Sequence, residues 1–192
     1  MPIDEIIERC TGGRGDGAMT IFDASYLISM TDQERLDHLP QQRQRYVFAV
    51  TKGVIRELCG KYKLSRKIEE EMLRGRSLSP SLPLRSYPPL YYLQQLGVRI
   101  YRPFVTSEQS GLITTLKDQG CTVTGDITKI SEPMSPEDVE QVALGIGHER
   151  TVVFFTDDGH IARTVPQVNK QEGQRMAVNS HIRRYSLSLP SF

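Results

Sequence analysis

The stretch SPEDVEQVALGIGHERTVVFFTDDGH, residues 135–160, decides the fold that we expect for this chain. It begins with a serine-proline pair that predicts a helix start, with Asp138 in the first turn and Gly147 placed to end the helix. A fully apolar run at residues 151–155 follows and leads into two adjacent carboxylates. Acidic side chains at the carboxyl end of a buried strand lie where open α/β sheets bind ligands, so the search for chemistry begins here.

Three short apolar runs upstream predict further strands, at residues 19–22, 46–50 and 98–101. Segments with helical periodicity lie between them, including residues 106–117. Strands that alternate with helices favour a parallel sheet covered on both faces. The sequence therefore predicts an α/β fold: three α/β/α layers around a central, mostly parallel sheet.

The domain organisation follows from length and composition. A chain of 192 residues with 38% hydrophobic residues can bury one sizeable core. Residues 1–18 include the glycine-rich stretch TGGRGDG and are predicted to be an N-terminal extension, and residues 19–192 a single domain. Residues 61–103 are predicted to be an insertion, because the proline-rich part at 75–89 suits an extended connection. The state of residues 121–130 stays open.

Composition excludes several classes of protein. The formal net charge of +1 gives no overall attraction to nucleic acid or membranes, so any basic surface must be local. The three cysteines, Cys10, Cys59 and Cys121, are widely spaced without a CxxC pair, which argues against a disulfide framework or a zinc site. No apolar run approaches the roughly 18 residues of a spanning helix, and no signal peptide is visible. We expect a cytoplasmic protein without a membrane partner.

Four carboxylates occupy equivalent places in the α/β series. Asp23 ends the first strand, Glu57 lies in the helix after the second, Asp138 opens a later helix, and Asp158 follows the last strand. A parallel sheet with right-handed crossovers gathers strand ends and helix starts at one edge, so the four can converge. Converging carboxylates raise one another's pKa unless a cation is present, and oxygen ligands of this kind suit a hydrated Mg²⁺ or Mn²⁺ ion.

Three blocks of the sequence, together about a quarter of the chain, resemble the successive signatures of PIN-domain nucleases. They are IFDASYLI at 21–28, VTKGVIRELCGKY at 50–62 and MSPEDVEQVALGIGHERTVVFFTDDGHI at 134–161. They carry a strand-ending Asp with Ser two residues on, a V-x-x-E-L helix, a helix-opening Asp and a final T-x-D. The chain departs from the pattern at Glu140 and Gln141, where the family usually has small or apolar residues, and in the insertion.

The resemblance implies a metal-dependent endoribonuclease that hydrolyses phosphodiester bonds of single-stranded RNA with one or two Mg²⁺ or Mn²⁺ ions, as a toxin or RNA-processing enzyme. The catalytic metal ligands would be Asp23, Glu57, Asp138 and Asp158. Asp157 is retained as a further metal ligand because the doubled aspartate makes the last position ambiguous. Ser25 and Thr156 would orient the carboxylates through hydrogen bonds.

Basic residues that could contact RNA lie outside these blocks. Arg74, Arg76 and Arg85 flank the proline-rich segment, and Arg183 and Arg184 lie in the C-terminal tail. Tyrosines close to the segment could stack on bases, or the segment could be a surface loop that packs its tyrosines on the core. The resemblance leaves open a protein partner, such as an antitoxin, and a homodimer.

A second hypothesis is a catalytically silent PIN-like module that binds RNA or protein through the tail and the tyrosine-rich insertion. A haloacid dehalogenase-type phosphatase, suggested by IFDAS, is excluded because it needs a second Asp at position 25, which is Ser. His148 and His160 lie close to the last two acids, yet single histidines near loops are more often surface residues, so neither is assigned to the site.

Overall fold

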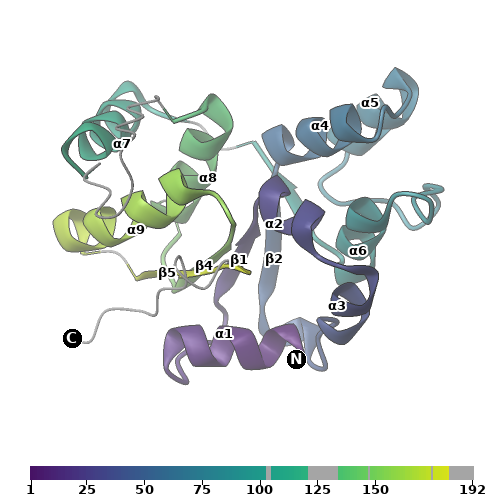
Figure 1. The fold of residues 1–192 in the computed structure, drawn as a ribbon, viewed down its shortest axis with the longest axis horizontal. Helices are drawn as coiled ribbons and strands as arrows, with labels where there is room; N and C mark the ends of the chain where they lie inside the picture. The colour runs from purple at the N-terminus through teal and green to yellow at the C-terminus, as the bar shows by residue number, and fades with distance from the viewer. Residues whose placement is uncertain (103–104, 121–133, 147, 174, 182–192) are drawn as a thin grey trace.

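A five-stranded, fully parallel sheet forms the centre of the protein, which confirms the predicted α/β class (Figure 1). The computed structural model describes residues 1–102, 105–120, 134–146, 148–173 and 175–181. The strand order is β3-β2-β1-β4-β5. The strands are β1 (Met19–Phe22), β2 (Val47–Thr51), β3 (Arg99–Tyr101), β4 (Val152–Phe155) and β5 (Met176–Asn179).

Helices cover both faces of the sheet, so the fold has the three layers that the sequence predicts (Figure 1). One face carries α1 (Ile3–Thr11), α2 (Ala24–Ser29), α4 (Lys52–Lys61), α5 (Arg66–Arg74) and α6 (Pro88–Leu96). The other face carries α7 (Ser107–Gly120), α8 (Pro136–Ile146) and α9 (Gly159–Glu172). The short helix α3 (Asp32–Asp37) buries none of its residues, as its polar sequence predicts, and a 3₁₀ turn, η1 (Arg43–Arg45), precedes β2.

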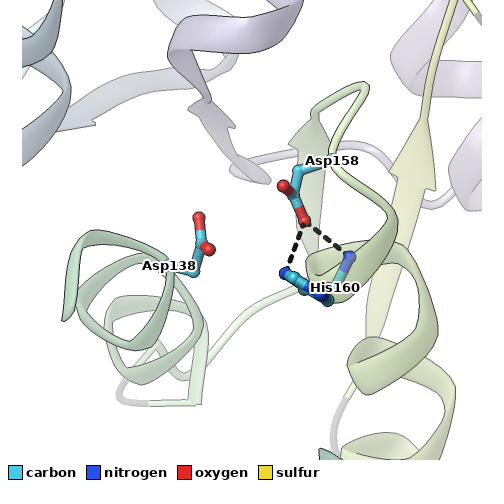
Figure 2. A group of neighbouring side chains, drawn as sticks. All are labelled: Asp138, Asp158 and His160. Carbon is cyan, nitrogen blue, oxygen red and sulfur yellow. Dashed lines mark hydrogen bonds and ion pairs between the residues drawn. The ribbon is translucent and has the colours of Figure 1, made fainter. Parts of the chain in front are cut away.

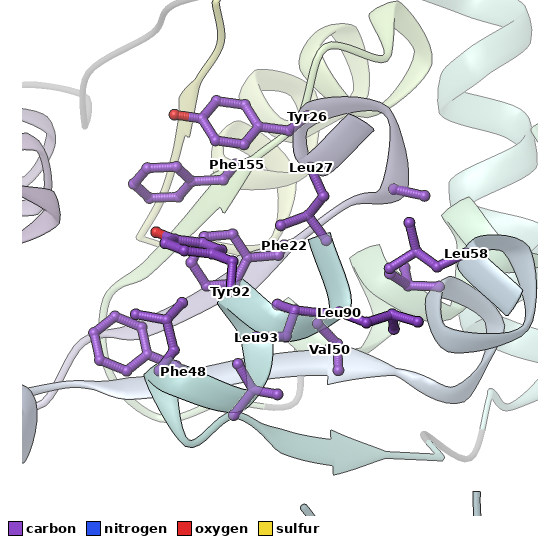
Figure 3. Packing of buried hydrophobic residues seen from close by; sticks show 14 of the residues in the cluster. Phe22, Tyr26, Leu27, Phe48, Val50, Leu58, Leu90, Tyr92, Leu93 and Phe155 are labelled. Carbon is purple, nitrogen blue, oxygen red and sulfur yellow. The ribbon is translucent and has the colours of Figure 1, made fainter. Parts of the chain in front are cut away.

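Strand β4 is apolar throughout because both of its faces are buried. Val153 and Phe155 point into the core under α1, α2 and α6, whereas Val152 and Phe154 point into the core under α8 and α9. In the first core, Phe22 packs against Phe155 with 5.2 Å between ring centroids (Figure 3). The strand thus joins both layers of helices to the sheet.

The order in which strands are added to the sheet reverses between β1 and β4. From β1 the chain builds β2 and β3 on one side, then crosses back through α7 and α8 to place β4 on the other side. Such a reversal opens a crevice outside the carboxyl ends of the two strands beside it, here β1 and β4, and α/β sheets bind ligands in crevices of this kind. Phe22 and Phe155 are paired in register, so Asp23 and Thr156 leave the sheet at the same level.

The segments predicted as an extension and an insertion contribute elements to the core and to the sheet. Residues 1–18 contain α1, whose Ile3, Ile6 and Ile7 belong to the main core. Residues 61–103 supply α5, α6 and the edge strand β3. Residues 161–165 are expected to form only a helical turn, but α9 continues to Glu172. Strand β5 follows it and is too short to stand out in the sequence as an apolar run. Residues 121–130 lie outside the described residues.

No helix in the described part of the chain is long and apolar enough to cross a membrane.

Close packing of α8 on the sheet gives a first testable prediction. A methyl group on Gly145 would lie 2.7 Å from Cζ of Phe154 and 3.1 Å from Sδ of Met176. Gly145→Ala should therefore lower the free energy of unfolding, measured with urea, by about 1–3 kcal/mol. Gly111→Ala in α7 is the control, because a methyl there meets nothing within 4 Å and should stabilise by about 0.5–1 kcal/mol. Equal stability of wild type and Gly145→Ala would contradict this packing.

Candidate metal site at the carboxyl edge of the sheet

Asp23 lies at the centre of the site, directly after β1, and is only 5% exposed. Its Oδ2 accepts hydrogen bonds from the backbone N–H of Ser25, the Ser25 hydroxyl and the Thr156 hydroxyl, the last at 3.0 Å. Its Oδ1 accepts one hydrogen bond, at 2.9 Å, from the amide Nε2 of Gln141. A carboxylate oxygen has two lone pairs, so Oδ2 is fully used and Oδ1 retains one open position.

Asp138 lies in the first turn of α8, one helix turn before Gln141. Its backbone N–H donates to the Ser135 hydroxyl at 3.1 Å, and its carboxylate accepts from the backbone N–H of Ser135 at 3.3 Å. This reciprocal pair is the helix start expected from the sequence. Burial, and then the charges of Asp158 and Asp23, raise the pKa of Asp138 to about 7, although the bonds from Ser135 oppose the shift.

Glu57 faces the same group of acids from α4. Thr51 caps this helix by accepting from the backbone N–H of Val54 at 3.4 Å. Desolvation raises the pKa of Glu57, and the charges of Asp23, Glu137 and Asp158 raise it further. The four acids predicted from the sequence therefore lie close enough for their charges to interact, and Glu137 adds a fifth that was not predicted.

Asp158 is the N-cap of α9, at the end of β4. Its Oδ1 accepts from the backbone N–H groups of His160 at 2.5 Å and Ile161 at 3.3 Å. Its own N–H donates to Thr156 Oγ1 at 2.9 Å. Because the same hydroxyl donates to Asp23, Thr156 joins the carboxylates that follow β1 and β4.

A compact group of side chains that could hold a metal ion forms where α8 faces the start of α9. Asp138, Asp158 and His160 each offer one ligand atom, and these atoms lie within 4.8 Å of one another (Figure 2). His160 was assigned to the surface in the sequence, yet its side chain is 22% exposed and lies in this group. Its position two residues after Asp158, in the first turn of α9, was the signal that could have identified it.

Asp157 is oriented differently from its neighbour. Its carboxylate accepts from the Ser29 hydroxyl, from the Ser180 hydroxyl at 2.6 Å and from the backbone N–H of His181 at 2.8 Å. Burial alone would raise the pKa of Asp157, but these hydrogen bonds outweigh it and lower the pKa. The side chain thus joins the ends of α2, β4 and β5, and it is not a member of the compact group within the described residues.

The residues predicted to bind RNA are distributed over a different part of the molecule. Arg74, at the end of α5, and Arg76 and Arg85, in the connection to α6, are exposed. Tyr92 is 3% exposed and packs edge-on against Phe22 in the core, so it offers no face for base stacking. Arg183 and Arg184 lie outside the described residues.

No protein-family model matches this chain, and no curated protein matches it.

Proposed function

We propose that this protein is a PIN-like, divalent-metal-dependent endoribonuclease that hydrolyses phosphodiester bonds of single-stranded RNA. The observation that carries the proposal is the group of Asp138, Asp158 and His160, whose ligand atoms lie within 4.8 Å of one another at the carboxyl edge of the sheet. Asp23 and Glu57 lie outside this group but near enough for their charges to interact with it. Two of these acids, Asp23 and Asp138, are buried, and a bound cation would offset the repulsion among the four charges.

The ligands present fit Mg²⁺ or Mn²⁺. Asp138 and Asp158 would hold the ion with His160, and Asp23 would contribute Oδ1, its one oxygen with an open lone pair. Single-oxygen coordination by few carboxylates suits a small ion that keeps part of its water shell better than it suits Ca²⁺. The amide oxygen of Gln141, buried and without a hydrogen-bond partner among the described residues, is a further polar atom beside these ligands.

The residues of the chain have separable roles in this proposal. A bound divalent ion would polarise the phosphate and acidify a water molecule. Ser25 and Thr156 fix Oδ2 of Asp23, so that the carboxylate cannot rotate away from the site. Glu57 has a raised pKa and a position on the solvent side, which suits a group that takes a proton from water.

Support for RNA as the substrate comes from the resemblance of the three sequence blocks to PIN-domain nucleases. Exposed arginines in α5 and in the connection that follows offer contacts to phosphates. The net charge of +1 implies that such contacts are local.

The test is cleavage of 5′-labelled single-stranded RNAs of several sequences with Mn²⁺ or Mg²⁺, against EDTA. We expect fragments only with metal. Asp23→Asn, purified in parallel, is the control for contaminating nucleases and should produce none. Absence of metal-dependent cleavage on every RNA tested would refute the nuclease proposal, and Mn²⁺ binding without cleavage would favour the silent binding module instead.

A further inference from the structure

Gln141 reaches the central carboxylate, Asp23, from α8. It is fully buried, and its Nε2 donates to Oδ1 of Asp23 at 2.9 Å. The two residues are 118 positions apart in the sequence. Among the described residues, this is the one side-chain hydrogen bond that joins α8 to Asp23.

The amide of Gln141 is held in one orientation by its partner. An ionised carboxylate only accepts hydrogen bonds, so the NH₂ group must face Asp23. The amide oxygen Oε1 then remains buried without a partner among the described residues. A buried unsatisfied oxygen is destabilising, so an apolar residue would serve better if this position contributed stability alone.

We propose that Gln141 is a positioning residue for the metal site, an inference that rests on the proposed metal-dependent function. Its amide ties the helix that carries Asp138 to the strand end that carries Asp23. Without this bond, repulsion between the carboxylates of Asp23 and Asp138 would move α8 away from the sheet edge. The two ligands would then be too far apart to share an ion.

The chemistry of an amide suits this task better than that of a charged donor. Lys or Arg at position 141 would also donate to Asp23, but its positive charge would compete with the cation for the acids. Glu would add negative charge, yet an ionised carboxylate cannot donate and would repel Asp23. Only a neutral donor holds Asp23 and leaves its full negative charge for the ion.

The experiment measures Mn²⁺ affinity by calorimetry for the wild type, Gln141→Met and Gln141→Glu, with the thermal midpoint of each metal-free protein. We expect Gln141→Met to weaken binding about 10-fold or more, with unchanged stoichiometry. Gln141→Glu should also bind more weakly despite its extra charge. Gln95→Met, the same change in α6 away from the site, should bind as the wild type does.

The outcomes separate the two proposals. Two results would overturn the positioning role and leave the metal site standing, provided that the wild type binds Mn²⁺. The first is the same Mn²⁺ affinity in Gln141→Met as in the wild type, and the second is tighter Mn²⁺ binding by Gln141→Glu. A lower thermal midpoint with unchanged affinity would also overturn it, because that is the effect of a residue that only stabilises the fold. No Mn²⁺ binding by the wild type would overturn the metal site and this inference together.

Discussion

Asp158→Asn is expected to reduce metal-dependent RNA cleavage at least about 1,000-fold, equivalent to about 4 kcal/mol of activation barrier. The substitution removes the charge of a carboxylate whose ligand atom lies within 4.8 Å of those of Asp138 and His160. Asn is as good an N-cap as Asp, and its side-chain oxygen can still accept from the first turn of α9. The folded structure should therefore persist while Mn²⁺ binding is lost. Calorimetry with Mn²⁺ and cleavage of labelled RNA measure the two effects.

Asp157→Asn is the matched control, one residue away in the same turn. Its carboxylate serves Ser29, Ser180 and His181 instead of the compact group, so Mn²⁺ affinity should change less than about threefold. The substitution should instead lower the free energy of unfolding, measured with urea, by about 1–3 kcal/mol. The reason is that the hydrogen bonds to this charged carboxylate, which join three elements, are weakened. If Asp157→Asn abolished Mn²⁺ binding and Asp158→Asn preserved it, the assignment of the doubled aspartate would be reversed.

Asp138 is expected to make the metal-free protein less stable as the pH rises from about 4 to about 7, whereas His38, whose pKa burial lowers to about 4, acts in the opposite direction. The pKa of Asp138 is about 7 in the folded protein, above its ordinary value of 3.8. Between these values the folded state retains a proton that the unfolded state has released, so a rise in pH favours unfolding. The raised pKa of Glu57 acts in the same direction. The contribution of Asp138 is about 2–4 kcal/mol and is fully lost above pH 7.

Asp138→Asn isolates this contribution. In EDTA, the variant should be more stable than the wild type at pH 8, and the difference should disappear near pH 4. Asn can still accept from the N–H of Ser135, so the helix start is retained. Mn²⁺ should stabilise the wild type at pH 8 and have little effect on the variant. Parallel pH profiles for the two proteins, measured by urea unfolding, would show that Asp138 is not the group responsible.

The sequence predicted the fold well where burial leaves a periodic pattern. Residues 19–22 and 151–155 were recognisable as strands because side chains on both faces of the central strands are buried, so each run is apolar throughout. The edge strand β5 was missed because four residues, MAVN, give no periodicity that distinguishes a strand from a loop. The helix α6 was missed because its start, Pro88 and Pro89, was assigned to the proline-rich connection, although proline is favoured in the first helical turn.

The positions of the site residues that depend only on topology could be predicted from the sequence. Asp23, Glu57, Asp138 and Asp158 follow strand ends or lie near helix starts, and a parallel sheet gathers such positions whatever the side-chain details. His160 and Gln141 depend on rotamers and on the distance between α8 and α9, which the sequence pattern does not contain. The distinction between Asp157 and Asp158 likewise depends on partners from α2 and β5 that are remote in sequence.

The hydrogen bonds to Asp23 have a consequence for synthesis of the chain on the ribosome. Two of its partners, Gln141 and Thr156, belong to the last third of the sequence, and β1 pairs with β4 from the same part. A nascent chain that ends before these residues carries Asp23 and Glu57 but lacks the hydrogen bonds from Gln141 and Thr156 to Asp23 and the neighbouring strand β4. Under the proposed function, RNA cleavage would therefore be withheld until residues 135–160 have been synthesised and have folded against β1.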